Sequence, residues 1–436
     1  MEPPPTGRGT DDALGALDDA LARFVPKQFL ELLGKRAIVD VVLGEAVERK
    51  LTILFLDIRD FTPLCEGMSP AETFQFVNAF LGALEPEIER HGGFVDKYIG
   101  DAIMALFPTS AADAIEGALA MLGALERFNE VRARAGRSAV RVGIGLNTGT
   151  AMVGTVGGPG RMETTVLSDA VNLAARLEEL TKRYGVPLLI SEATLYSLGK
   201  APPSTTRFLD RIRVKGKTQP HSVYEVFDAD APDLRAAKIA TRARFEEGVA
   251  WYHMKRVDRA LPLLRACAAE APGDAPARIY VDRCQAVLDG GAHEGTGEID
   301  GTVVWRDEFT VGFAPIDDQH HELLAAFNRL APGLAAGDRA TVQQTLEFLA
   351  RYVREHFGLE EERMRRYAYP FMKEHLAEHR SFIEHFQRLR DEIDSGHHEQ
   401  PFLVFLVQIF LIDWFANHST GTDRHLARFL VRAGAT

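Results

Sequence analysis

The chain has 436 residues, enough for about three domains of ordinary size, and its content of 46% hydrophobic and 26% charged residues is that of a globular protein rather than a disordered or fibrous one. The 62 acidic residues outnumber the 50 basic ones and give a net charge of -12, which argues against a protein that binds nucleic acid through its phosphates. The cysteines lie far apart, and neither a signal peptide nor a long apolar run is visible, so we expect a cytoplasmic protein with reduced thiols and no membrane insertion.

The N-terminal half predicts an α+β domain that follows an irregular start. Residues 1–44 combine a Pro- and Gly-rich stretch, expected to be disordered, with a short helical lead-in that Pro26 interrupts. Across residues 45–228, apolar strand patterns alternate with helical ones, which predicts a layered fold. The expected elements are a buried strand at 51–58, a helix that Ser69 caps and that ends near His91, a hairpin at 94–108, a strand at 141–149 and a helix from Asp169 to about Arg183.

After residue 228 the pattern becomes helical. Residues 229–289 predict a short connector of three helices, whose order of Trp, Tyr, Ala, Leu and Pro resembles tetratricopeptide units. A Gly- and acid-rich stretch at 290–302 is the predicted linker. Residues 303–436 predict an all-α four-helix bundle, with helices at about 317–336, 338–367, 371–395 and 401–432. Ten of the 14 histidines lie beyond residue 319, so we expect their imidazole groups to have a functional role in the bundle.

Two aspartates at predicted strand ends carry the first chemical signal. Asp57 closes one apolar strand and Asp101 opens another. Carboxylates that converge across neighbouring strands can hold Mg²⁺ or Mn²⁺, through hard oxygen ligands, for a nucleoside triphosphate. Two isolated aspartates are more often turn residues, so the motifs around them decide between these interpretations.

These motifs resemble the catalytic domain of class III nucleotidyl cyclases. The shared stretches, in the order of that family, are LFLDIRDFT, FVDKYIGDAIMALFP, TTVLSDAVNLAARLE and VKGK. The resemblance runs from Phe24 to Phe227 and implies a ferredoxin-like α+β fold. It also implies that Asp57 and Asp101 bind a pair of Mg²⁺ or Mn²⁺ ions, which activate the ribose 3'-hydroxyl and bind the triphosphate.

The same resemblance implies the substrate-binding residues. Lys97 and Thr165 match the pair that contacts adenine, and a threonine at the second position is similar to subclass b, which includes bicarbonate-responsive adenylyl cyclases. Asn172 and Arg176, four residues apart on one helix face, match the residues that orient the ribose and stabilise the pentavalent phosphorus, and Lys215 matches the contact to the terminal phosphates. Since one protomer of the family supplies the carboxylates and the other the remaining groups, the resemblance implies a homodimer with shared sites.

Histidines and carboxylates recur at helical spacing in the predicted bundle. Two pairs are four residues apart, and a further histidine is followed by an aspartate at the fifth residue. Such groups, converging inside four helices, suit a two-metal centre, and iron is the best match for mixed nitrogen and oxygen ligands. The set comprises His320, His356, Glu360, His375, His379, His418 and Asp423.

The segment from Trp305 to about Leu430 resembles the bacterial hemerythrins, through IDDQHHELL, HFGLEEERM, HLAEH and WFANHSTGTD. The resemblance implies that all seven residues ligate two irons, with Glu360 and Asp423 as bridges, and that one iron keeps an open position for O₂ or a related diatomic. The remaining histidines of the segment fall outside this pattern and are interpreted as surface groups or outer partners of the ligands: His321, His385, His397, His398 and His425.

Both resemblances together predict a cytoplasmic signalling enzyme, a homodimeric adenylate cyclase that converts ATP to 3',5'-cyclic AMP and pyrophosphate and is modulated by a di-iron sensor of oxygen or redox state. One alternative is an oxygen- or iron-binding protein with an inactive cyclase, which the complete residue set from Asp57 to Lys215 argues against. A guanylate cyclase is a second alternative, which Lys97 disfavours. A di-iron oxidase or peroxidase fused to a cyclase is a third, which the ligands alone do not distinguish.

Overall fold

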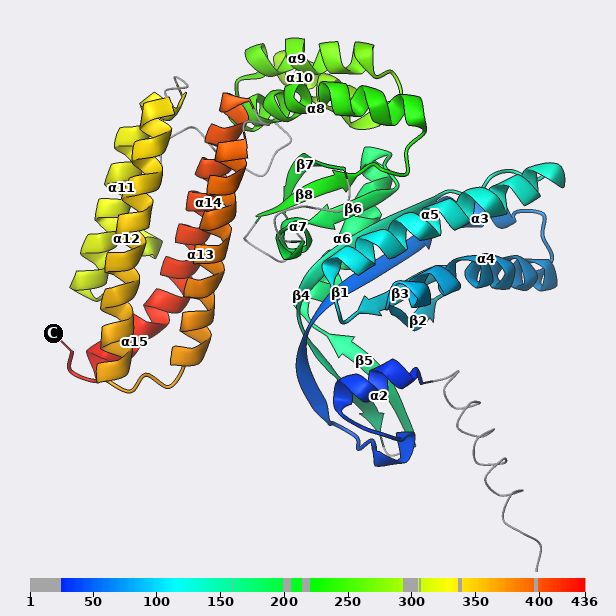
Figure 1. Ribbon diagram of the computed structural model, residues 1–436, viewed down its shortest axis with the longest axis horizontal. Helices are drawn as coiled ribbons and strands as arrows, with labels where there is room; N and C mark the ends of the chain where they lie inside the picture. The colour runs from blue at the N-terminus through cyan, green and yellow to red at the C-terminus, as the bar shows by residue number, and fades with distance from the viewer. Residues whose placement is uncertain are drawn as a thin grey trace, which may run out of the picture. The chain divides into compact units, whose positions relative to one another are not determined.

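The computed structural model describes residues 25–158, 160–198, 205–213, 220–292, 305, 307–335, 339–395 and 399–435 (Figure 1). The chain divides into two compact units, one of Met1–Thr206 with Val223–Asp230 and the other of Arg207–Ser222 with Ala231–Thr436. The predicted disordered start and most of the predicted linker lie outside the described residues.

A mixed sheet forms the centre of the first unit (Figure 1). Its two long strands, β1 (Ala46–Ile58) and β4 (Val142–Gly158), are antiparallel, with Leu54 opposite Leu146. The strand order is β2-β3-β1-β4-β6-β8-β7, and β5 pairs with the far part of β4. The remaining strands are β2 (Phe94–Ile99), β3 (Ala102–Phe107), β5 (Arg161–Leu167), β6 (Leu188–Ser191), β7 (Thr206–Arg213) and β8 (Pro220–Val226). Of these, β7 after Thr206 and β8 up to Ser222 belong to the second unit.

The helices of this unit begin where their capping residues predict. Ser69 and Glu72 form a reciprocal capping box at the start of α4 (Pro70–Arg90), and α4 packs along α5 (Ala111–Arg134). Ser168 accepts a hydrogen bond from the third residue of α6 (Asp169–Tyr184), a helix that lies directly on β4. The shorter helices are α2 (Lys27–Leu33), η1 (Ile38–Asp40), α3 (Phe61–Cys65) and α7 (Glu192–Ser197).

A close approach between α6 and β4 positions the site residues of both elements. Gly145 makes it possible, because a Cβ at this position would lie 2.3 Å from the backbone nitrogen of Glu178. Apolar residues of the sheet and of α2 form the core beside this contact, among them Phe29, Leu51, Phe94 and Val153. The sheet and α6 therefore make one rigid support.

The second unit starts with a helical connector. Its helices are α8 (Pro232–His253), α9 (Val257–Glu270) and α10 (Ala275–Leu288), in agreement with the predicted three helices. A fully buried, bidentate ion pair joins Arg207 of β7 to Asp274, with nitrogen–oxygen distances of 2.8 and 2.6 Å. A second buried pair joins Arg283 of α10 to Asp210 of β7 at 2.9 Å. The connector is therefore fixed to β7 by charge as well as by packing.

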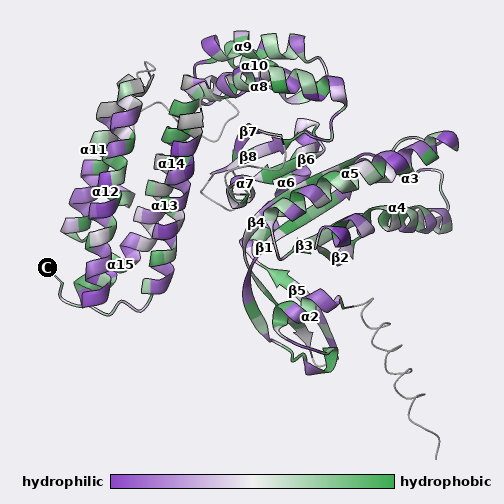
Figure 2. Ribbon diagram, in the orientation of Figure 1, coloured by the Kyte–Doolittle hydropathy of each residue, from purple (hydrophilic) through white to green (hydrophobic). Residues whose placement is uncertain are grey.

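Four long helices form the bundle, as the sequence predicts. They are α11 (Ala314–Ala335), α12 (Arg339–Arg366), α13 (Met372–Ser395) and α14 (Gln400–His418), and a short 3-10 helix, η2 (Asp307–Phe309), precedes them. Polar and apolar residues alternate along α12 and α13, as amphipathic helices require (Figure 2). Apolar side chains of all four helices, among them Leu323, Leu349, Phe382 and Phe415, fill the interior.

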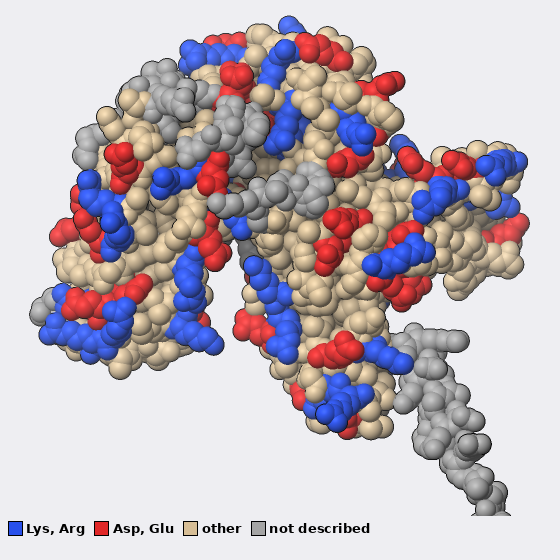
Figure 3. Space-filling model, viewed as in Figure 1, with Lys and Arg blue, Asp and Glu red and all other residues tan. Residues whose placement is uncertain are grey.

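The sequence predicts one continuous fourth helix at 401–432, and this prediction is wrong. A π-helical turn, η3 (Ser419–Asp423), interrupts it, and α15 (Arg424–Arg432) follows. No helix among the described residues combines the length and apolarity needed to cross a membrane. On the described surface in Figure 3, basic and acidic side chains are interspersed, and no large area of one sign is visible on that face.

Candidate catalytic site and metal centre

Asp57 and Asp101 converge, as predicted from their positions at strand ends. Asp57 lies near the end of β1, and Asp101 lies in the turn just before β3, its neighbour in the sheet. Gly100 supplies the positive φ of 68° that this tight turn requires. Burial, the negative charge of Asp57 and a side-chain hydrogen bond between the two carboxyl groups raise the pKa of Asp101 to about 6. Two carboxyl groups this close favour a bound cation, which offsets their mutual repulsion.

A third acidic group lies close to this pair. Glu178 of α6 is buried and forms an ion pair with Arg59 at 3.5 Å. Burial raises the pKa of Glu178 to about 7; the negative charges of Asp57 and Asp101 act in the same direction, and Arg59 opposes them. The carboxylates thus create a local excess of negative charge that favours a bound cation.

The predicted base-reading pair is also in contact. The ammonium of Lys97 donates a hydrogen bond to Thr165 Oγ1 at 3.1 Å, and so joins β2 to β5. Two carboxylates flank the same ammonium, Asp96 Oδ2 at 3.4 Å and Glu163 Oε1 at 4.0 Å. Lys97 is therefore held in one place by groups from two strands rather than extended into solvent.

Asn172 and Arg176 lie one turn apart on α6, and both are exposed. Arg176 forms an ion pair with Glu179, three residues further on the same helix. Within the described part of the chain, neither residue forms a hydrogen bond or ion pair with Asp57 or Asp101. Lys215 lies outside the described residues. The structure therefore brings the two carboxylates together and, separately, the two base-reading residues. It leaves Asn172 and Arg176 exposed.

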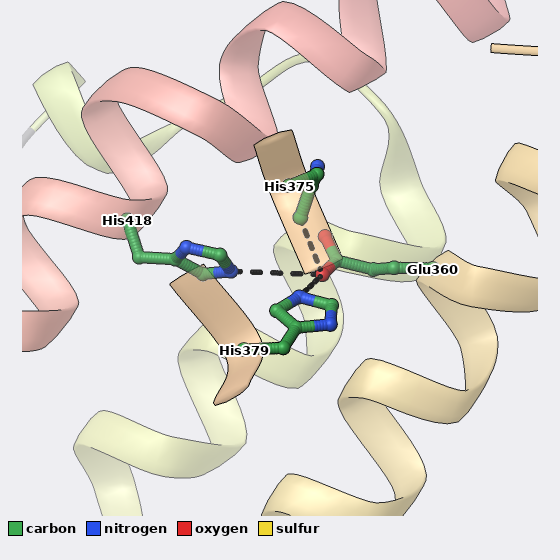
Figure 4. A group of neighbouring side chains, drawn as sticks. All are labelled: Glu360, His375, His379 and His418. Atoms are coloured by element: carbon green, nitrogen blue, oxygen red, sulfur yellow. Dashed lines mark hydrogen bonds and ion pairs between the residues drawn. The ribbon is translucent and has the colours of Figure 1, made fainter. Parts of the chain in front are cut away.

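All seven predicted metal ligands meet inside the bundle, and each is buried to the level of 2% exposure or less. Figure 4 shows the imidazoles of His375, His379 and His418 directed at the carboxylate of Glu360. Their Nε2 atoms lie 3.2, 3.1 and 3.6 Å from Glu360 Oε2. One cation at the position of these atoms would have nitrogen and oxygen ligands from three helices.

A second group of potential ligands adjoins the first. His320 Nε2 lies 3.0 Å from Asp423 Oδ2, and His356 Nε2 lies 3.7 Å from the same oxygen and 3.7 Å from Glu360 Oε2. His418 Nε2 lies 2.9 Å from Asp423 Oδ1. Glu360 and Asp423 thus each touch histidines of both groups, which is the arrangement that bridging carboxylates need.

Outer partners fix how two of the imidazoles are oriented. Gln319 Oε1 lies 3.0 Å from His356 Nδ1, and Glu378 Oε2 lies 3.1 Å from His418 Nδ1. The hydroxyl of Thr422 donates a hydrogen bond to the same Glu378 oxygen at 2.6 Å. When Nδ1–H donates to an acceptor, the Nε2 lone pair is free to point into the cluster as a neutral ligand.

The electrostatics of the cluster suit a cation as well. Burial alone would raise the pKa of Glu360, but the imidazoles of His356, His375 and His379 hold that pKa well below its usual range. Glu360 Oε1 is buried and has no hydrogen-bond partner among the described residues. Anionic, incompletely satisfied carboxylates amid imidazoles are a donor set that fits two iron ions.

Sequence reasoning missed the outer partners. Gln319 and Glu378 are neighbours in sequence of His320 and His379, yet they contact histidines on other helices. Helical spacing predicts which side chains share a face but not which facing helix they meet, so no sequence signal identified them. Two of the histidines predicted to lie outside the ligand set have other contacts. A hydrogen bond of 2.7 Å joins His425 Nδ1 and the Tyr369 hydroxyl, and His321 stacks on Trp305. His397 and His398 lie outside the described residues.

Comparison with known families agrees with the two predicted resemblances. Residues 45–226 match the family model of the adenylate and guanylate cyclase catalytic domain, and residues 311–430 match the model of the hemerythrin HHE cation binding domain. The chain thus contains one segment that matches the cyclase model and one that matches the hemerythrin model, in the order that its motifs predict.

Among curated proteins, the chain is 37% identical over 274 residues to "Adenylate cyclase, terminal-differentiation specific" of Dictyostelium discoideum, an alignment of 62% of this chain and 13% of that protein. It is 42% identical over 214 residues to an adenylate cyclase of Anabaena cylindrica, covering 48% of this chain and 43% of the relative. The chain therefore spans less than half of either relative. A solved structure, the adenylyl cyclase CyaB from P. aeruginosa, is 29% identical, with a TM-score of 0.39 over 42% of this chain and 96% of that one.

Proposed function

We propose that the protein is an adenylate cyclase that converts ATP to 3',5'-cyclic AMP and pyrophosphate. The observation that carries this proposal is the convergence of Asp57 and Asp101 within a cyclase catalytic domain, in a unit that also holds Lys97 against Thr165. Both curated relatives are named adenylate cyclases, which supports ATP over GTP.

Each residue has a role that follows from its chemistry. Asp57 and Asp101 would hold a pair of Mg²⁺ or Mn²⁺ ions, which supply Lewis acidity to the 3'-hydroxyl and charge neutralisation to the triphosphate. The ammonium of Lys97 donates to the ring nitrogen N1 of adenine, and the Thr165 oxygen accepts from the exocyclic amine. Lys215 contributes positive charge toward the terminal phosphates.

The active assembly in this proposal is a homodimer. Asn172 and Arg176 are exposed and form no hydrogen bond or ion pair with the carboxylate pair, within the described part of the chain. A second protomer can bring its own Asn172 and Arg176 to the ribose and the α-phosphorus beside Asp57 and Asp101, which completes each site.

The hemerythrin domain is proposed to hold two irons and to bind O₂ or a related diatomic. Glu360 and Asp423 would hold the two ions together with the five imidazoles, a role supported by the short distances between the histidine Nε2 atoms and the two carboxylates. Because Gln319 and Glu378 hold the outer nitrogens of His356 and His418, those two rings are oriented before a metal arrives.

Helix α14 connects this centre to the connector. His418 is the last residue of α14, and Phe405 lies near the start of the same helix. The ring of Phe405 stacks on that of His253 of α8 and packs against that of Phe208 of β7, with a distance of 5.5 Å between ring centroids in each case. Phe402 contacts Phe208 as well, at 5.7 Å. A helix is stiff over the roughly 20 Å between Phe405 and His418, so a shift of His418 is transmitted to β7 and the connector.

The test is cyclic nucleotide production by the purified full chain, with ATP or GTP and with Mg²⁺ or Mn²⁺. We expect metal-dependent cyclic AMP formation that is faster with ATP than with GTP, and loss of turnover in Asp57→Ala and in Asp101→Ala. Asp113→Asn is the control, since its carboxylate accepts a hydrogen bond from Thr109 at the start of α5. A wild type without activity, or with equal or better turnover of GTP, would contradict the proposal.

A further inference from the structure

We propose that Asp96 is a positioning residue for Lys97, and thereby a determinant of which purine nucleotide the site accepts. This inference rests on the proposed cyclase function. The hairpin of β2 and β3 is irregular where Asp96 and Lys97 lie.

A β-bulge places Asp96 beside Lys97. In the register of β2 and β3, Val95 lies opposite Ala105 and Lys97 lies opposite Met104, so Asp96 is the extra residue of the bulge. Without it, neighbouring side chains of a strand point to opposite faces of the sheet. A bulge changes that alternation locally and can bring two successive side chains together. Here the result is an ion contact of 3.4 Å between sequence neighbours, Asp96 Oδ2 and Lys97 Nζ.

The Asp96 carboxylate is fully buried, and Lys97 is its one ionic contact among the described residues. Its side chain has 0% exposure, and neither Oδ1 nor Oδ2 has a hydrogen-bond partner in the described part of the chain. Burial raises the pKa of Asp96, and the charge of Lys97 opposes that rise. A buried carboxylate without hydrogen bonds lowers the stability of the fold unless an ion contact compensates. For Asp96 that contact is Lys97.

Lys97 needs more than one contact to hold its ammonium in a fixed direction. Its ammonium donates a hydrogen bond to the Thr165 hydroxyl at 3.1 Å on one side, and on another side Asp96 Oδ2 is an ionic contact at 3.4 Å. Thr165 carries no charge, and Glu163 is 4.0 Å away and 57% exposed, so it is screened by water. Asp96 is therefore the buried carboxylate that fixes the direction of the ammonium.

The consequence concerns base selection. Adenine presents an acceptor at N1, whereas guanine presents a donor there, so a fixed ammonium at this position distinguishes the two bases. An ammonium that is free to move can instead reach the carbonyl oxygen of guanine. Loss of the Asp96 charge should therefore weaken discrimination between ATP and GTP more than it slows the chemical step.

The experiment compares Asp96→Asn with Glu163→Gln in the full-length protein, since each variant removes one negative charge near Lys97. For Asp96→Asn we expect kcat/KM for ATP to fall about tenfold, mainly through KM, and the ratio of ATP to GTP turnover to fall as well. For Glu163→Gln we expect a smaller change, because the lost charge is exposed. Thermal unfolding monitors folding, and Asp96→Ser repeats the measurement if Asp96→Asn proves unstable.

A double-mutant cycle separates positioning from a general structural effect. If Asp96 acts through Lys97, Asp96→Asn should cause little further loss of ATP selectivity once Lys97→Gln is present. An active Asp96→Asn enzyme with unchanged selectivity, or additive losses in the cycle, would overturn the inference and leave the cyclase proposal intact. A wild type that makes no cyclic nucleotide would overturn both.

Discussion

His418 and Asp423 are five residues apart in sequence, yet His418 Nε2 lies 2.9 Å from Asp423 Oδ1. In a regular α-helix, residues at this spacing point about 140° apart, and the two groups would not share a face. The π-helical turn at Ser419–Asp423 supplies the missing rotation, because its wider turn brings the fifth residue back to the same side. The interruption of the fourth helix is thus what completes the metal cluster.

Insertion of one alanine after Gly421 tests this relationship. The insertion places Asp423 six residues after His418, where neither an α-helical nor a π-helical turn brings the two groups to one face, so the purified protein should lose bound iron. Gly421→Ala is the matched control: a Cβ there meets nothing within 4 Å, and the length of the turn is kept. Metal analysis and the absorption of the iron centre give the result. Full iron content in the insertion variant would show that the register between His418 and Asp423 is dispensable.

Glu378 should affect iron affinity although it is not a predicted ligand. Glu378→Ala removes the acceptor of His418 Nδ1 and frees that imidazole to rotate, and such losses weaken metal binding by about 10- to 100-fold. Thr422→Val, which removes only the hydroxyl bonded to Glu378, should have a smaller effect. Competition with an iron chelator measures both. Equal affinity of Glu378→Ala and the wild type would mean that packing alone orients His418.

Shared active sites should be detectable by mixing inactive variants. Asp57→Ala and Arg176→Ala protomers should each lack activity, and a mixture should recover part of it, since one intact site forms in each mixed dimer. The assay is cyclic AMP formation after the two proteins are combined, with dimers verified by sedimentation. No recovery in verified mixed dimers would contradict a site built from both protomers.

Acidic groups near the catalytic carboxylates should make metal-free stability depend on pH. The pKa of Glu178 is raised from 4.5 to about 7 by burial, so between these values the folded protein holds a proton that the unfolded chain releases. The free energy of unfolding therefore falls as pH rises through this interval. Glu178→Gln should reduce the fall in melting temperature of the cyclase unit between pH 5 and pH 8, with a remainder due to Asp101. Glu179→Gln, on the exposed side of α6, is the control. A fall of unchanged size in Glu178→Gln would contradict the assignment.

The elements that carry the sites could be predicted from the sequence because their signals are local. Ser69 with Glu72 marks a helix start, and the glycine at 100 marks the hairpin turn, whatever the rest of the fold does. The four bundle helices follow from their periodicity. Contacts between distant elements could not be predicted in this way. The π-turn at 419–423, the bulge at Asp96 and the partnership of Glu378 with His418 depend on which elements face each other, and no spacing rule encodes that.

The most direct test of the whole account is the cyclase rate of the wild type in air and under anaerobic reduction, compared with the same measurements on His375→Ala. His375 Nε2 lies 3.2 Å from Glu360 in the buried cluster, so this variant should fail to form the iron centre while its catalytic domain is unchanged. We expect the wild-type rate to differ between the two states and the rate of His375→Ala to be the same in both. An equal wild-type rate in air and under reduction, matched by the variant, would contradict regulation by the di-iron domain.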